Sequence, residues 1–114
     1  MPLPPLVRQL VEAKLDKYCE QKIPPHARDK IKLIYKFRGN TVTLVETRPY
    51  FKDDSIWTER GFAQLRYDPD DNTWALYWAD RNRRWHLYDF VEPTRELDTI
   101  LAALDNDKTG IFWG

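Results

Sequence analysis

Two charged residues in the first half of the chain have the spacing of a small site. Glu46 and Arg48 lie two positions apart in a segment with strand alternation, so their side chains point to the same side of the sheet. A carboxylate beside a guanidinium is a candidate for proton transfer or anion binding. We favour the alternative of a structural ion pair at the margin of the core. A metal-dependent hydrolase would need further carboxylates, and the spacing of Asp53 and Asp54 does not select them.

His86 is a further candidate for a catalytic residue. It lies between Trp85 and Leu87, and a lone histidine on a sheet is more often a hydrogen-bonded structural residue than a catalyst. As a general base it would need a partner, and the sequence places no serine, cysteine or aspartate beside it. The single cysteine, Cys19, is expected to pack as a small hydrophobe. Two histidines and one cysteine argue against a zinc site, so we predict no metal and no cofactor.

Aromatic and basic residues form a third candidate, a binding surface. We predict that Tyr77, His86 and Tyr88 lie on the sheet face that the helices leave open. Basic residues of an earlier strand share that face: Lys30, Lys32, Lys36 and Arg38. Aromatic stacking beside a basic track is how sheet surfaces hold single-stranded nucleic acid. The 18 basic and 18 acidic residues give no net attraction for nucleic acid, which makes nucleic-acid binding the less favoured interpretation. The alternatives are a solvated face of lysines and threonines with tyrosines lying across it, or the surface for a homodimer or protein partner.

The first half of the chain predicts a helix and a hairpin. Residues 4–23 carry apolar side chains at helical spacing and end before two prolines. Residues 31–38 and 42–51 alternate on either side of Gly39 and Asn40, which suit a two-residue turn. That turn pairs Phe37 with Val42, Tyr35 with Leu44, and Leu33 with Glu46. The register therefore places Glu46 and Arg48 on the apolar side of the hairpin.

The second half predicts three more strands and a helix. Residues 52–55 are expected to form a loop, and residues 61–67 a strand on which Phe62 faces away from Ala63. Residues 74–79 and 85–88 flank a tight polar turn with an even number of residues, which pairs Trp78 with Trp85 and Tyr77 with His86. A last helix begins near Thr94, the expected N-cap, and ends near residue 104. The apolar final residues, 111–114, are expected to pack back onto the body.

These elements make one α+β domain over residues 1–114. The predicted architecture is a five-stranded antiparallel meander with an N-terminal and a C-terminal helix packed on one face. No apolar run approaches the ~20 residues needed to cross a bilayer, and the first residues lack the features of a signal peptide. We therefore expect a cytoplasmic protein without a membrane partner.

Several short motifs together resemble one family. They are Pro24-Pro25-His26-x-Arg28-Asp29-Lys30, Glu46-x-Arg48-Pro49, Trp74-x-Leu76-Tyr77-Trp78, Asp80, Trp85-His86-x-Tyr88 and Asp107-x-x-Gly110-x-Phe112-Trp113-Gly114. The chain resembles the small bacterial domain-of-unknown-function family numbered three thousand and twenty-four, from which it departs at Asn82. The resemblance implies a bacterial, stand-alone domain, and it brings no activity, substrate or catalytic residue.

Two functional hypotheses follow. The first is a binding or interaction module, for protein or nucleic acid, that uses Tyr77, His86 and Tyr88 with the basic residues of the open sheet face. The alternative is a small enzyme, hydrolytic in one version, whose site joins Glu46, Arg48 and His86 in one cleft.

Overall fold

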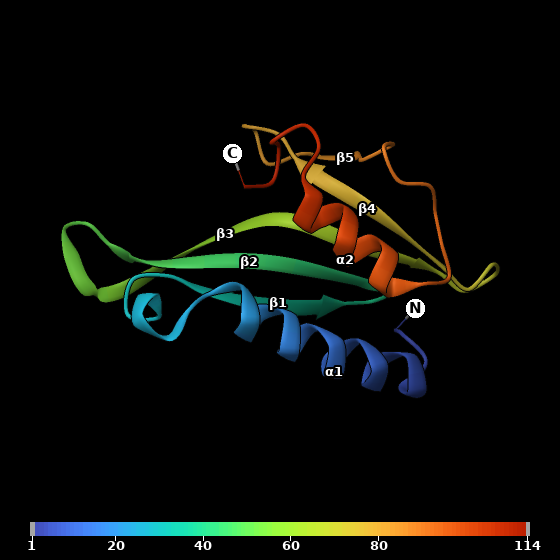
Figure 1. The fold of residues 1–114 in the computed structure, drawn as a ribbon, viewed down its shortest axis with the longest axis horizontal. Helices are drawn as coiled ribbons and strands as arrows, with labels where there is room; N and C mark the ends of the chain where they lie inside the picture. The colour runs from blue at the N-terminus through green and yellow to red at the C-terminus, as the bar shows by residue number, and fades with distance from the viewer. Residues whose placement is uncertain (1, 114) are drawn as a thin grey trace.

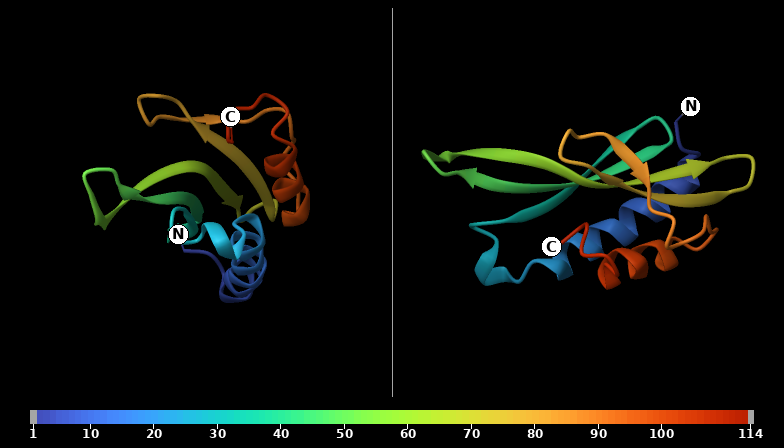
Figure 2. Two further views of the ribbon diagram at one scale, coloured as in Figure 1. Left: turned by 60° about the vertical axis from the view of Figure 1, so that its left-hand side comes forward. Right: turned by 90° about the horizontal axis from the view of Figure 1, so that it is seen from above.

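The computed structural model describes residues 2–113. The elements are α1 (Pro5–Lys22), the short 3₁₀ helix η1 (Pro25–Ala27), β1 (Lys32–Arg38), β2 (Thr41–Tyr50), β3 (Asp53–Asp68), β4 (Thr73–Ala79), β5 (Trp85–Leu87) and α2 (Leu97–Asn106). The strands form one antiparallel sheet in the order β1-β2-β3-β4-β5, and both helices lie on the same side of it (Figures 1 and 2). The predicted fold class and meander are confirmed.

The core lies between the helices and the sheet. Its fully buried side chains come from both helices and the central strands: Val11, Leu15, Val42, Leu44, Leu65, Leu76, Ile100 and Leu104. The helix α1 begins with Pro5 in the first turn, where a missing N–H breaks no hydrogen bond. It ends where Ile23 turns extended before Pro24. The helix α2 begins later than predicted, with Glu96 as its N-cap, and the Thr94 hydroxyl accepts the Glu96 N–H from outside the helix.

The β1–β2 hairpin has the predicted register. Phe37 pairs with Val42, and Leu33 pairs with Glu46. Gly39 has a φ of 59°, which a residue with a side chain rarely adopts, so the glycine permits the two-residue turn. The neighbouring Asn40 accepts the backbone N–H of Tyr67 at 3.0 Å, and its side-chain amide donates to the Tyr67 carbonyl at 2.7 Å. The turn is therefore fixed against the end of β3.

Strand β3 is longer than the sequence indicated. It begins at Asp53, so the prediction of a loop over residues 52–55 is wrong beyond its first residue. The reason is that Tyr50 pairs with Asp53 across a very short connection, and regular pairing resumes at Trp57 opposite Pro49 after a register shift. The alternation predicted for Phe62 is also wrong. Leu44 pairs with Ala63 and Val45 with Gly61, so Phe62 is a bulged residue and packs in the core together with Ala63.

The β4–β5 register differs from the prediction by one residue. Trp78 pairs with His86, and Tyr77 pairs with Leu87. The turn contains three residues between Asp80 and Arg84, whose backbones are joined by a 2.9 Å hydrogen bond, and Arg83 takes a positive φ of 63°. An odd turn length shifts the strand by one residue and exchanges its two faces.

The exchange of faces corrects the predicted binding surface. His86 lies on the helix side with Trp78, where the two rings stack with centroids 4.7 Å apart. Tyr88 is 3% exposed and belongs to the core. Trp85 and Leu87 share the open side with Tyr77 instead. The prediction that Tyr77, His86 and Tyr88 share a face is therefore wrong.

The C-terminal segment packs onto the body at Phe112 and Trp113, as predicted, whereas Ile111 is exposed. Phe112 is 2% exposed and contacts Tyr88, with ring centroids 5.0 Å apart. The Asp107 carboxylate accepts the backbone N–H groups of Phe112 and Trp113, and the Trp113 indole donates to the Leu104 carbonyl. Gly114, also part of that prediction, lies outside the described residues. Over residues 2–113, neither helix combines the length and the apolar character that a membrane span requires.

Candidate functional site

The open face is the side of the sheet that the helices leave uncovered. We define it by residues whose strand pairing puts them on that side: Lys32, Lys36 and Arg38 of β1, Thr43 of β2, Trp57, Glu59, Gln64 and Arg66 of β3, Tyr77 of β4, and Trp85 and Leu87 of β5. The sheet is twisted and curved, and the tips of the β2–β3 and β4–β5 hairpins project separately (Figure 2). The predicted binding residues Lys32, Lys36, Arg38 and Tyr77 all lie on this face.

Two aromatic rings of the open face each carry a cation. The Lys32 ammonium lies 4.7 Å from the centre of the Trp57 ring, and the Arg66 guanidinium lies 3.8 Å from the centre of the Tyr77 ring. These distances are within the range of cation–π attraction. Arg66 also donates to the Gln64 side-chain carbonyl at 2.7 Å, which fixes the guanidinium over the ring.

A third ring, that of Trp85, lies over a glycine. A Cβ atom on Gly61 would stand 3.7 Å from the Trp85 ring and 3.2 Å from the Thr43 methyl group. The absence of a side chain at Gly61 therefore lets the Trp85 indole approach β3 closely. Sequence reasoning missed Trp57 and Trp85 as surface residues. Trp85 was missed because the turn between Asp80 and Arg84 has an odd number of residues, which places Trp85 on the open face. Trp57 was missed because β3 begins at Asp53 and so includes it.

Where β3 and β4 diverge, a polar cleft of about 570 Å³ opens beside Trp85. Arginines from both sides line it: Arg60 of β3, and Arg81 and Arg83 of the β4–β5 turn. Asp80 and Glu59 provide carboxylates at the same place. The cleft extends the open face with a group of guanidinium side chains.

Glu46 and Arg48 form the contact that the sequence predicted. Arg48 Nε lies 2.6 Å from Glu46 Oε1, and the second oxygen, Oε2, lies 3.5 Å from a guanidinium nitrogen of Arg60. The Glu46 side chain is 12% exposed, whereas both arginines are exposed. A carboxylate whose two oxygens each face a guanidinium is poorly placed to bind a metal ion. Among residues 2–113, no three His, Cys, Asp or Glu side chains cluster in a way that could hold one.

His86 has an acidic partner that the sequence did not suggest. Its Nε2 lies 2.7 Å from Asp80 Oδ2, while Asp80 Oδ1 accepts the backbone N–H groups of Asn82 and Arg84. Within the described residues, no hydroxyl or thiol group hydrogen-bonds to the His86 ring. Glu46 and His86 thus have separate partners, which gives no support to an enzyme site that would join them.

Asp80 is expected to titrate at low pH. The hydrogen bond to His86, followed by the one from the Arg84 N–H, holds the pKa of Asp80 below its ordinary value. A lowered pKa in the folded state means that the contribution to stability is present above the unfolded pKa of about 4 and is lost as pH falls through the folded pKa. Carbon-detected NMR titration should give an Asp80 midpoint below about 3.9.

His86→Ala is the matched variant for this prediction. Removing the imidazole should move the Asp80 midpoint upward toward the ordinary aspartate value, because the hydrogen bond that contributes most to the lowered pKa is lost. A wild-type midpoint at or above the ordinary value, or one that is insensitive to His86→Ala, would contradict the pairing. The backbone N–H donors of Asn82 and Arg84 remain in the variant, so a residual lowering is expected.

Comparison with known proteins bears on the family resemblance. No curated protein and no solved structure matches the chain. The family model described as Domain of unknown function (DUF3024) matches residues 3–114. Because this match spans nearly the whole chain and includes all the motifs noted above, the protein belongs to the DUF3024 family.

Proposed function

We propose that this protein is a binding module whose open face holds a single-stranded nucleic acid. The observation that carries the proposal is the presence of three aromatic residues, Trp57, Tyr77 and Trp85, on one face beside lysine and arginine side chains. Nucleic-acid bases stack on aromatic rings, and neighbouring cations neutralise the phosphates. Sheet surfaces of this composition bind single strands, whose bases are free to turn toward the protein.

The distribution of charge supports a polyanionic ligand. The open face carries Lys32, Lys36, Arg38 and Arg66, and its carboxylate between Trp57 and Arg66, Glu59, pairs with Lys36 at 2.5 Å. Lys32, Arg38 and Arg66 form no ion pair among the described residues. The turn beside the face adds Arg81, Arg83 and Arg84, and among the residues described none of the three forms an ion pair. The zero net charge of the chain therefore conceals a basic face.

An oligonucleotide titration tests the proposal. A fluorescein-labelled oligothymidine of about 12 nucleotides matches the site size of single-strand-binding folds, and its anisotropy should rise on binding. Affinity should fall with salt, with a logarithmic slope of about −0.7 for each phosphate neutralised. Trp57→Ala and Tyr77→Ala should each weaken binding by about tenfold, since stacking contributes ~1–3 kcal/mol per base.

Phe90→Ala is the matched control. Phe90 is also an exposed aromatic residue with a lysine near its ring, Lys108 at 5.5 Å, but it lies outside the strands of the open face. Its replacement should leave the oligonucleotide affinity unchanged. Equal losses in all three variants, or no binding at low salt, would overturn the proposal. A stable dimer whose dissociation is promoted by Trp57→Ala would instead assign the face to a second copy of the chain.

A further inference from the structure

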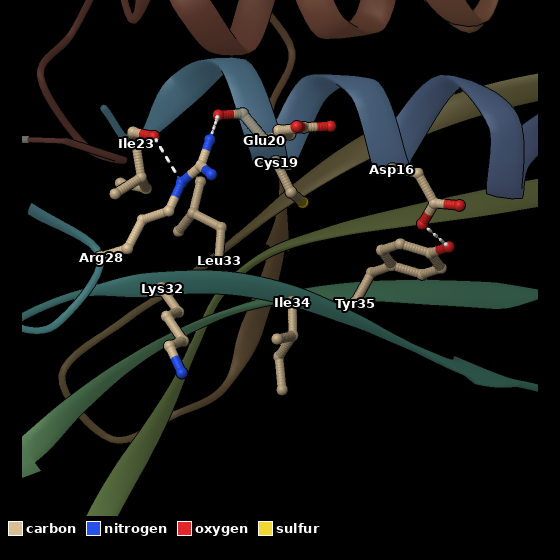
Figure 3. A pocket seen from close by; sticks show the side chains of 9 residues that line it. All are labelled: Asp16, Cys19, Glu20, Ile23, Arg28, Lys32, Leu33, Ile34 and Tyr35. Carbon is tan, nitrogen blue, oxygen red and sulfur yellow. Dashed lines mark hydrogen bonds between the residues drawn. The ribbon is translucent and has the colours of Figure 1, made fainter. Parts of the chain in front are cut away.

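A groove runs along the free edge of the sheet, between α1 and β1 (Figure 3). Its volume is about 510 Å³, and four successive residues of β1, from Lys32 to Tyr35, line it. Successive side chains of a strand point to opposite faces, so a cavity that touches four in a row must follow the edge of the strand. Figure 3 shows this alternation, with Leu33 and Tyr35 directed toward α1 and Lys32 and Ile34 away from it.

The backbone of β1 is available on this edge. Strand β1 is the first in the sheet order and pairs only with β2. Asn40 of the turn is bonded to Tyr67 of β3, which makes the even-numbered residues of β2 the ones that bond toward β3. Their partners in β1 therefore turn their N–H and C=O groups outward: Leu33, Tyr35 and Phe37. No loop or turn backbone within residues 2–113 bonds to these groups.

The groove is held open by polar contacts at its ends. At one end, Arg28 donates to the carbonyls of Glu20 and Ile23 at 3.0 and 3.3 Å, which ties the end of α1 to the segment before β1. At the other end, the Tyr35 hydroxyl donates to the Asp16 carboxylate of α1. Between them the walls are formed by Cys19, Ile23 and Leu33. The lining is thus apolar in the middle, and hydrogen bonds between α1 and the β1 region fix the groove at both ends.

We propose that the β1 edge binds an extended acidic peptide of a partner protein as a sixth strand. The backbone groups of Leu33, Tyr35 and Phe37 would bond to the peptide, as in other cases of strand addition. Side chains on the helix side of the peptide would be apolar and enter the groove beside Cys19. Side chains on its other side would lie next to Lys32, Arg38 and Lys36, of which Lys36 also contacts Glu59, and aspartate or glutamate is favoured beside these cations.

The same cations disfavour a second copy of this chain at the edge. Two β1 strands paired antiparallel around a two-fold axis would bring the lysines and Arg38 of both copies to the same side, and like charges at close positions repel. Lysine on an edge strand is a known protection against self-association. An acidic strand would direct its carboxylates toward the cations of the open face and its apolar side chains toward the groove, where Asp16 and Glu20 also lie. The edge therefore discriminates by charge on the side away from α1. The inference shares Lys32, Lys36 and Arg38 with the open face, but it rests on the outward backbone groups of β1 and on the groove, which an oligonucleotide on the open face would not occupy.

A short peptide that alternates aspartate and leucine is the probe. Labelled with fluorescein, it should bind with at least about tenfold higher affinity than the same peptide with lysine in place of aspartate, because three cross-strand charge contacts of ~0.2–1 kcal/mol change sign. Methylation of alternate backbone nitrogens of the probe should abolish binding, since it removes the strand hydrogen bonds. Equal affinity for the acidic and basic peptides would overturn the proposal, as would tolerance of backbone methylation.

Cys19 gives a second, independent readout. It is the only cysteine, and burial, followed by the nearby Asp16 carboxylate, raises the pKa of its thiol to about 11, so alkylation at neutral pH should be slow but measurable. Because Cys19 lines the groove, the acidic probe should slow its alkylation further, and the lysine probe should not. Binding of the acidic probe without protection of Cys19 would place the peptide elsewhere and contradict the proposal.

Protein variants complete the test. Arg38→Glu should reverse the preference between the two probes or cancel it, while Lys108→Glu, the same charge change outside the sheet, should leave it intact. Cys19→Phe should block the groove and abolish binding. Retention of the wild-type circular dichroism spectrum by Arg38→Glu ensures that its result reports on the edge. An unchanged preference in a folded Arg38→Glu variant would overturn the charge argument.

Discussion

Replacing Phe112 by alanine is expected to lower the free energy of unfolding by about 3–5 kcal/mol. The side chain is 2% exposed, lies against Tyr88, and belongs to the main core cluster. Its removal would leave a cavity that the docked tail cannot fill by moving, because the tail is fixed by hydrogen bonds to Asp107. Urea denaturation should show a lower midpoint with a similar slope, since the folded state remains compact.

Ile111→Ala is the control for this experiment. Ile111 precedes Phe112 in the same segment but is exposed, so its truncation should cost less than about 1 kcal/mol. If Phe112→Ala also cost less than about 1 kcal/mol, the C-terminal segment would not be docked in solution. Asp107→Ala should lie between the two variants, because it removes the carboxylate that holds both the Phe112 and Trp113 N–H groups.

The docked tail was predictable because its residues leave few alternatives. An exposed run of Ile111, Phe112 and Trp113 would be a large apolar surface at a chain end, which proteins avoid. The sequence also indicated the β1–β2 register, since Gly39 and Asn40 define a turn of known length. Once the turn length is known, every pair along the hairpin follows. In both cases residues adjacent in the sequence were enough to predict the structure.

The errors share a different physical cause. The start of β3 is polar and has low strand propensity at Asp53 and Asp54, yet Asp53 pairs with Tyr50 of β2, and residues 54–56 lie in a register shift before Trp57 pairs with Pro49. The bulge at Phe62 adds one residue to the ladder, and the neighbouring Gly61 is its signal, since an isolated glycine inside a strand pattern often marks a bulge. The turn before β5 is closed by Arg83 at positive φ, a conformation for which glycine or asparagine would be the usual signal.

These errors explain which part of the candidate site was missed. The contact between Glu46 and Arg48 depends only on one strand and its alternation, so it could be predicted from the sequence. Arg60 reaches Glu46 from β3, and Asp80 reaches His86 across the β4–β5 turn. Both partners depend on registers set by the bulge and by the three-residue turn. Long-range partners of a site are therefore the first to be lost when one irregularity in a sheet is unrecognised.

The β4–β5 register itself is open to a direct energetic test. Tyr88→Ala should lower the free energy of unfolding by about 3–5 kcal/mol, because Tyr88 is 3% exposed and packs against Phe112. Leu87→Ala should cost less than about 1 kcal/mol, because Leu87 is 47% exposed on the open face. The two residues are adjacent, so the comparison isolates which face each occupies. Chemical denaturation of the two variants provides the measurement.

An alternative β4–β5 register, with an even number of residues in the turn, would reverse the expected effects of the two substitutions. It would place Leu87 on the helix side and Tyr88 on the open face, so Leu87→Ala would be the damaging change and Tyr88→Ala would be mild. The backbone also distinguishes the two, because the Tyr88 N–H donates to the Leu76 carbonyl at 2.8 Å and its exchange with solvent should be slow. Rapid exchange of that amide together with a mild Tyr88→Ala would favour the even turn. It would return His86 to the open face, where the binding experiments would then need to include it.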